Sequence, residues 1–366
     1  MDRFARLSRF EVGLALMSSL LSSALPPGAG RAQSQAPGGA SQIEVTRLGD
    51  GPLVTVESSR TLGVNVNGPS LIRVPGWVQH SLGRYYLYFA NHKGKFIRLA
   101  YADKISGPWK IYEPGVLRVE DTALGRPAPA IDTNSLYTHI ASPEIYIDND
   151  RHKIILWAHG FWTDGQPWPA NLDPEQAQRW LTEHRYDQYS QSFESADGLH
   201  FTAHPAITKA GYLRVFRYGE SFYSVSRLGR VGRSTDPFGE FTLAQSLFRD
   251  TPYAGRARHV ALLRRGDTLY VFFSAFGDTP EHILVATVDL SKPWQEWKAE
   301  HPVDVLTSET AYECANLPVF TSQAGELDVP VHQLRDPAIF EEDGHVYLLY
   351  STCGEQGIAL AEIRLP

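Results

Sequence analysis

From residue 43 onward, the hydrophobic positions form short runs rich in β-branched and aromatic residues, and Gly, Pro, Asp and Asn separate these runs. This pattern is typical of β-strands joined by tight turns and predicts an all-β domain. Residues 173–185, DPEQAQRWLTEHR, differ because an Asp and a Pro precede a run of helix formers. We expect a helix there, capped by Asp173 and inserted into a loop.

The strand runs recur as a loose repeat with a period of roughly 45 to 65 residues. Each unit has an entry strand, an aromatic strand and a polar strand, and the polar strand often closes on an SxDG or GPW turn. The entry strands are GPSLIRVPG, ASPEIYIDND, GYLRVFRYG, ARHVALLRRGD and RDPAIFEEDG. Five units predict a five-bladed β-propeller over residues 43–366, in which each entry strand begins at the axis.

Residues 43–49, IEVTRLG, are a candidate strand to complete the last blade and close the ring. A β-sandwich or jelly roll has similar short strands and is the structural alternative. Such a fold would not require three entries that share an X-Pro-X-hydrophobic opening. We therefore favour the propeller.

The N-terminal segment predicts export. Arg3, Arg6 and Arg9 precede a short apolar run that ends in small residues, which indicates a secretory signal peptide over residues 1–32. Residues 33–42 then form a flexible linker. We expect a secreted or periplasmic protein with no membrane span in the mature chain, and an uncleaved anchor is the alternative.

The charge of the chain bears on its binding partners, and its cysteine content bears on disulfide pairing. The chain has 34 Lys and Arg against 41 Asp and Glu, so we expect no nucleic-acid partner. Cys314 and Cys353 are the only cysteines, and the sequence alone leaves open whether they pair. No oligomerisation signal stands out, and we expect a monomer.

Three entry strands contain the same proline, in GPSLI, SPEIY and DPAIF, so Pro69, Pro143 and Pro337 are equivalent. Because side chains alternate along a strand, the residues just before and just after each proline should point the same way. This reasoning directs both Asp336 and Glu144 toward one axial cavity. Two carboxylates facing one cavity suit glycoside hydrolysis, in which one activates water and the other protonates the leaving oxygen.

The stretches RDPAIFEEDGHVYLLYS and RLAYADKISGPWKIY resemble the blade motifs of the five-bladed glycoside hydrolases, families 43, 62 and 32 and their relatives. The resemblance covers about residues 60–364 and implies an inverting glycoside hydrolase acting on a polysaccharide or oligosaccharide. In family 43 the base is an Asp before a proline, which Asp336 matches, and the acid is a Glu for which Glu144 and Glu313 are candidates. Asp132 is the candidate for the second, tuning Asp. The chain departs from the family where Gly68 replaces the base of the first blade.

Further residues are candidates for substrate binding. Histidines occupy similar places in several units, and converging strands would bring them to one rim. The candidates are His92, His139, His159, His259, Arg98 and Arg335. For Arg98, Arg214 and Arg258 the hypothesis is a contact with a uronate or sulfate, with surface ion pairs as the alternative. Trp77, Trp162 and Trp168 are candidates to stack on sugar rings.

No CxxC or HExxH spacing indicates a zinc site, and we expect no required cofactor. The resemblance allows a structural cation such as calcium near the axis. Arg335 and Asp336 have a simpler interpretation as an ion pair that supports the blade.

Two other functions fit the same sequence. One is a polysaccharide lyase, with His139, His159 or a Tyr as base and an Arg that neutralises a uronate. The other is a carbohydrate-binding propeller without activity, which the missing first-blade Asp would explain. Fold alone does not decide among them.

Overall fold

The computed structural model describes residues 43–124, 138–162, 172–184 and 187–365. They belong to a compact unit, Ser41–Pro366. The signal peptide and the linker lie outside the described residues and stay predictions. Among the described helices, none is long and apolar enough to cross a membrane.

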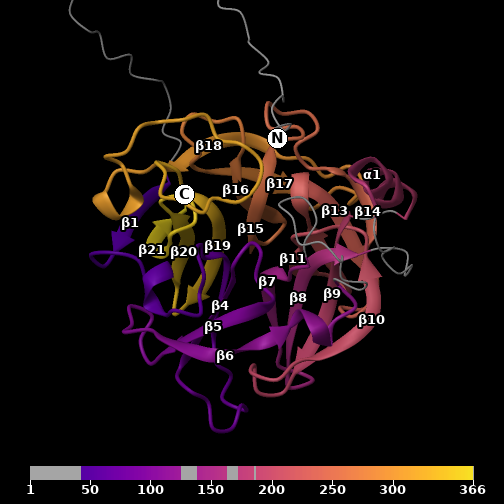
Figure 1. Ribbon diagram of the computed structural model, residues 1–366, viewed down its shortest axis with the longest axis horizontal. Helices are drawn as coiled ribbons and strands as arrows, with labels where there is room; N and C mark the ends of the chain where they lie inside the picture. The colour runs from indigo at the N-terminus through magenta and orange to yellow at the C-terminus, as the bar shows by residue number, and fades with distance from the viewer. Residues whose placement is uncertain (1–42, 125–137, 163–171, 185–186, 366) are drawn as a thin grey trace, which may run out of the picture. The chain divides into compact units, whose positions relative to one another are not determined.

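The described unit is a five-bladed β-propeller, as the repeat predicts (Figure 1). Each blade is a sheet of antiparallel strands, and the first strands of neighbouring blades contact one another around the axis. The innermost strands are β3 (Asn67–Arg73), β7 (Ala141–Asp148), β11 (Arg214–Tyr218), β15 (Ala257–Arg265) and β19 (Arg335–Glu342). The second strands are β4 (Tyr85–Ala90), β8 (Lys153–Trp162), β12 (Ser221–Val225), β16 (Thr268–Ala275) and β20 (His345–Thr352). The third strands are β5 (Phe96–Ala102), β9 (Asp187–Ser195), β13 (Arg230–Ser234), β17 (Ile283–Asp289) and β21 (Gly357–Arg364). The outermost strands are β6 (Lys110–Arg118), β10 (Thr202–Thr208), β14 (Thr242–Ser246), β18 (Glu300–Leu306) and β1 (Glu44–Leu48).

The first strand of the described chain closes the ring. β1 pairs antiparallel with β21, with Val45 opposite Ile363, so the fifth blade combines both ends of the propeller. The short strand β2 (Val54–Thr55) also pairs with β21. The predicted role of residues 43–49 is therefore confirmed.

Five clusters of buried hydrophobic side chains lie between neighbouring blades. Representative pairs, going round the ring from the first and second blades, are Tyr88 with Leu156, Trp157 with Phe222, Tyr223 with Phe273, Phe272 with Tyr350, and Phe89 with Leu360. Burial of each such side chain contributes about 1.5–3 kcal/mol. Because apolar packing joins every blade to the next, the axial ends of the innermost strands are held on a rigid frame.

The residue before the proline is left-handed in three innermost strands. Gly68, Ser142 and Asp336 have φ values of 57°, 48° and 49°, and the strand pairing shifts register at each of these points. The alternation that we expected is therefore interrupted by a bulge. Asp336 therefore occupies the same position in its strand as Ser142 and Gly68. The prediction that the side chains of Glu144 and Asp336 point in the same direction is wrong, because the bulge lies between the two positions.

The predicted helix forms as α1 (Pro174–Glu183), between β8 and β9. Asp173 accepts a hydrogen bond from the Gln176 backbone N–H at 2.8 Å, and the Gln176 side chain accepts one from the Asp173 N–H at 3.1 Å. This capping box explains where the helix begins.

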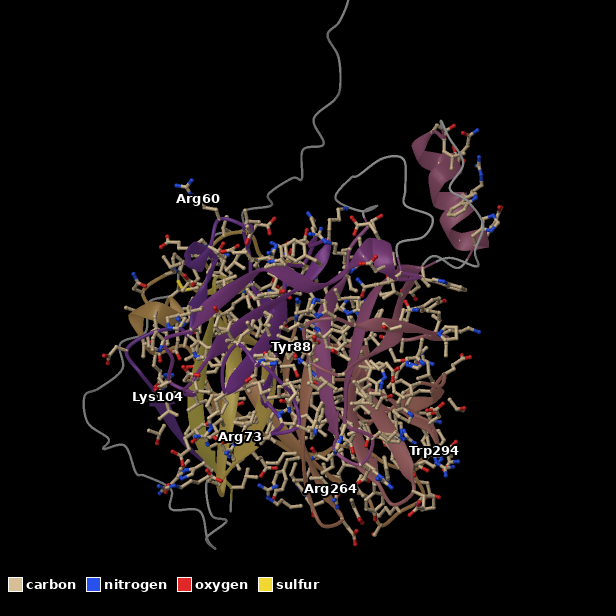
Figure 2. All side chains as sticks on the ribbon, turned by 90° about the horizontal axis from the view of Figure 1, so that it is seen from below. Arg60, Arg73, Tyr88, Lys104, Arg264 and Trp294 are labelled. Atoms are coloured by element: carbon tan, nitrogen blue, oxygen red, sulfur yellow. A yellow bond between two sulfur atoms is a disulfide. The ribbon has the colours of Figure 1, made fainter. Side chains whose placement is uncertain are left out.

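The two ends of the innermost strands lie at opposite faces of the propeller. In Figure 2, Arg60, which precedes the first blade, lies at one face, whereas Arg73 and Arg264, near the far ends of β3 and β15, lie at the other. The residues that start the innermost strands therefore gather on the face near Arg60.

Candidate active site

A cavity of about 110 Å³ lies at the end of the propeller where the innermost strands begin. Its walls come from the starts of β9 and β15, from the segment that precedes β11, from the segments that follow β4, β12 and β16, and from the long loop between β18 and β19. The lining residues are His92, Gln188, Tyr212, Arg227, Ala257, Arg258, His259, Phe276, Ala324, Gly325 and Glu326. We call this the axial cavity.

Asp336 and His259 form the centre of the site. Nδ1 of His259 contacts Oδ1 of Asp336, and Nε2 of His259 lies 3.1 Å from the Ser142 hydroxyl. Burial alone would raise the pKa of Asp336, but the neighbouring His259, Arg258 and Arg335 hold it well below its usual range. Burial lowers the pKa of His259. The carboxylate is therefore ionised and accepts a hydrogen bond from the Nδ1–H of His259, which leaves the Nε2 lone pair facing the Ser142 hydroxyl.

A buried cluster of arginines and carboxylates supports this pair. Nε of Arg335 lies 3.1 Å from Glu281, its Nη1 lies 3.2 Å from Glu355, and Nε of Arg258 lies 3.3 Å from Glu281. The Arg335 side chain is 1% exposed, so it holds the scaffold and does not reach the cavity. Its ion-pair partners are Glu281 and Glu355, and Asp336 is bound instead by His259.

The loop between β18 and β19 is fastened to this cluster. Arg258 donates to the carbonyl oxygens of Gln323 and Gly325, each at 2.8 Å, and Arg335 donates to that of Gly325 at 3.1 Å. A disulfide between Cys314 and Cys353 ties the same loop to the turn after β20, which settles the pairing that the sequence left open. One wall of the axial cavity is thereby fixed.

The pKa of His92 is shifted in the opposite direction to that of His259. Its Nδ1 lies 3.3 Å from Glu355, and although burial lowers the pKa of His92, the Glu355 carboxylate raises it overall. No described residue is bonded to Nε2 of His92, and the side chain lines the axial cavity. The Glu355 carboxylate therefore favours the protonated imidazole, in which Nε2–H is a donor available to a ligand.

The predicted histidines do gather at the axis, around Tyr212. Its ring centre lies 3.8 Å from that of His159 and 4.2 Å from that of His259, and His139 lies 5.5 Å from His159. Burial lowers the pKa of His159 well below its ordinary value and raises that of Tyr212 to about 12. His139 and His159 are buried, and they are not among the described residues that line the cavity.

The structure does not bring Glu144 to the cavity. Its Oε2 lies 2.7 Å from Nη1 of Arg214, and the Val215 backbone N–H donates to Oε1 at 3.4 Å. Arg214 in turn donates to the carbonyl oxygens of Pro143 and Pro69. Nε of Arg214 also donates to the Val260 carbonyl oxygen at 3.0 Å, so this pair joins four innermost strands, β3, β7, β11 and β15, and has a structural role.

Glu313 is equally occupied. It is fully buried, accepts from Arg47 and from the Tyr350 hydroxyl at 2.8 Å each, and also accepts the backbone N–H groups of Glu309 and Thr310. These donors fasten β1 and the β18–β19 loop to the fifth blade. These hydrogen bonds hold the pKa of Glu313 below its usual value, which favours a structural carboxylate and not a proton donor.

The remaining predicted residues lie elsewhere. Nη1 of Arg98 donates to the Thr61 carbonyl oxygen, and its guanidinium stacks on Phe96 at 4.3 Å. Trp77 and Trp162 are not among the described residues that line the axial cavity. The candidates Asp132 and Trp168 lie outside the described residues.

Sequence reasoning missed several residues of the site, namely Tyr212, Arg227, Glu281, Glu326 and Glu355. All except Glu326 lie just before an innermost strand or in the connection between a second and a third strand, so they share one face of the propeller. A systematic reading of those positions in every unit would have found them.

Among the described residues, no group of three or more His, Cys, Asp or Glu side chains is arranged to hold a metal. A calcium site stays an untested prediction.

No family model matches the sequence. The chain is 32% identical over 322 residues to "Uncharacterized protein R118" of Acanthamoeba polyphaga mimivirus, covering 83% of this chain and 84% of that protein. The fold is similar to the crystal structure of a thermostable family-43 glycoside hydrolase, with a TM-score of 0.51, 13% identity and coverage of 82% of this chain and 88% of the other.

It is also similar to the GH43_1 enzyme of Xanthomonas citri in complex with xylose, with a TM-score of 0.51, 13% identity and coverage of 86% and 88%. At such identities the likeness concerns the fold, and it agrees with the propeller that the repeat predicts. The chain therefore belongs to the family of the mimivirus protein R118, with a five-bladed propeller fold like that of the family-43 glycoside hydrolases.

Proposed function

We propose that this protein is a glycoside hydrolase that cleaves its substrate in the axial cavity. One observation carries the proposal: two histidines line the same cavity, and their surroundings shift their pKa values in opposite directions. Such a divergence is how an active site obtains an acid and a base at one pH. The glycosidase-like fold supplies the substrate class.

His92 is the proposed proton donor. Glu355 raises its pKa and so favours the protonated form, in which Nε2–H is available to the leaving oxygen when the bond between that oxygen and the anomeric carbon breaks. Such donation contributes about 10²- to 10⁴-fold to the rate.

His259 is the proposed proton acceptor. As water attacks the anomeric carbon, its proton passes through the Ser142 hydroxyl to Nε2 of His259, and Asp336 stabilises the imidazolium that forms. Asp336 is fully buried, so it positions His259 and does not contact the sugar. This scheme replaces the two-carboxylate arrangement that we expected, and inversion stays a prediction.

Export, action on carbohydrate outside the cytoplasm and a monomeric state belong to the same proposal. They rest on the N-terminal sequence and on the absence of an oligomerisation signal.

Turnover on a panel of polysaccharides and aryl glycosides tests the proposal, with reducing ends and ultraviolet absorbance both recorded. Asp336→Asn should lower kcat by at least about 100-fold, because the amide donates to Nδ1 and moves the imidazole proton to Nε2. Asp304→Asn is the matched control, since Asp304 pairs with His282 at 3.0 Å on the exposed side of a blade.

New reducing ends without absorbance, lost in Asp336→Asn alone, are the expected result. An absorbing, unsaturated product would indicate a lyase. Glycan binding without turnover would indicate a binding propeller, and either outcome would overturn the hydrolase.

A further inference from the structure

Arg227 stands at the mouth of the axial cavity on a fixed piece of backbone. It begins the single turn η3 (Arg227–Gly229), between β12 and β13. Its backbone N–H donates to the Gly211 carbonyl oxygen at 3.0 Å, and the Gly229 N–H closes the turn on Ser226 at 2.8 Å. The residue is exposed and lines the cavity.

The carboxylates around the cavity already have partners. Glu281 is bound by Arg258 and Arg335, Glu355 by Arg335 and His92, Asp336 by His259, and Glu326 by Lys93 at 2.7 Å. Among the described residues, none forms an ion pair or a side-chain hydrogen bond with Arg227. Arg227 lines the cavity, and its guanidinium has no counterion among the described residues.

The other lining groups increase this positive character. Arg258 and His92, whose pKa is raised by Glu355, are part of the wall, and Glu326 is the one carboxylate among the described residues that line it. The charge of Arg227 acts on the same space, because it opposes the rise that burial causes in the pKa of Tyr212. A neutral sugar would leave this guanidinium unused.

We propose that the cavity takes an anionic sugar, whose carboxylate or sulfate group pairs with Arg227. This inference rests on the proposed function and names its substrate class. A planar guanidinium forms two parallel hydrogen bonds with a carboxylate, and charge-assisted bonds of this kind are the strong ones. Gln188 supplies a complementary contact, because its Oε1 is buried without a partner among the described residues and can accept a sugar hydroxyl.

Calorimetric binding to the full chain tests the proposal. The probes are D-glucuronate, D-galacturonate and glucose 6-sulfate, each compared with neutral glucose or galactose. We expect the anionic sugars to bind at least about 10-fold more tightly than the neutral ones. Affinity should fall as salt is raised, since the pair lies near solvent. The carboxylate and sulfate arms show which anion the site prefers.

Arg227→Gln should weaken binding of the anionic sugars by about 10- to 100-fold and leave the neutral sugars unchanged, because a charged hydrogen bond is lost. Arg230→Gln is the matched control: Arg230 is an exposed arginine three residues further on that lines a different hollow. Its binding should match that of the unaltered protein. Equal melting temperatures would show that both variants are folded.

Equal affinity for anionic and neutral sugars, or an unchanged preference in Arg227→Gln, would overturn the inference. Failure of the two proposals can be told apart, because binding is measured without turnover. If anionic sugars bind tightly but no glycan is cleaved, the proposed hydrolase activity is contradicted and the anionic site is not. If only neutral glycans are cleaved, the proposal of an anionic substrate is contradicted and the hydrolase activity is not.

Discussion

A single left-handed residue in front of a proline decides which side chain reaches the propeller axis. Asp336 and Ser142 both occupy this position and both contact His259. In the first blade the position is Gly68, where a Cβ atom would lie 2.9 Å from the Cα of Ser142. The close approach of the first two blades therefore requires glycine, and the first blade cannot supply a carboxylate there.

The protonated His92 leads to a prediction about leaving groups. His92→Gln should lower kcat on glycosides with poor leaving groups by about 10²- to 10⁴-fold, because the departing oxygen then lacks a proton donor. A dinitrophenyl glycoside needs no such donor and should retain most of its turnover. Equal losses on both substrates would contradict the role of His92 as the acid.

His159 should make stability depend on pH. Burial holds its pKa well below the ordinary value of 6.5, so the unfolded chain binds its proton first as the pH falls. The neutral histidine thus contributes stability above about pH 6.5, and this contribution is lost below it. His159→Phe keeps a ring against Tyr212 and should flatten the loss between pH 7 and pH 5, measured by urea unfolding.

The control for this experiment is His345→Phe, which alters an exposed histidine. In this variant the free energy of unfolding should fall between pH 7 and pH 5 as steeply as in the unaltered protein. If the free energy of unfolding of His159→Phe falls between pH 7 and pH 5 as steeply as that of the unaltered protein, another group causes the loss of stability at acid pH.

At the scale of elements, the loop between β18 and β19 forms one wall of the site and is held by the disulfide. Cys314 and Cys353 are 39 residues apart, so replacing both with Ser should lower the free energy of unfolding by about 3–4 kcal/mol. The wall that contains Gly325 and Glu326 should loosen at the same time and raise KM. Unchanged urea unfolding together with an unchanged KM would contradict this role.

The elements themselves could be predicted from sequence because each depends on local patterns. The strands follow runs of β-branched and aromatic residues, α1 follows Asp173 and Pro174, and β1 follows IEVTRLG. The different directions of the Asp336 and Glu144 side chains could not be predicted. A bulge within a strand interrupts the alternation of side chains and leaves no signal in a single sequence. The ion-pair partners of Arg335 come from distant turns and depend on the assembled ring.

At the scale of the whole molecule, β1 closes the ring by pairing with β21, and Arg47 of β1 forms an ion pair that holds this closure. Arg47 pairs with the buried Glu313 at 2.8 Å, so removing β1 would leave an uncompensated buried charge and an open edge on β21. A chain that begins at Gly49 should lose at least about 3 kcal/mol of stability and self-associate in size-exclusion chromatography. A chain that begins at Ser41, where the compact unit starts, is the control and should behave as the full chain.

The pH profile of kcat/KM on the glycan that is cleaved tests the central claim most directly. The account predicts a bell-shaped profile of kcat/KM. The rate should fall below pH 6.5 as His259 becomes protonated and fall above pH 6.5 as His92 loses its proton. The alkaline limb should disappear in His92→Gln. An acidic limb near pH 4, typical of an exposed carboxylate, or an alkaline limb that persists in His92→Gln would contradict the pair of histidines as acid and base.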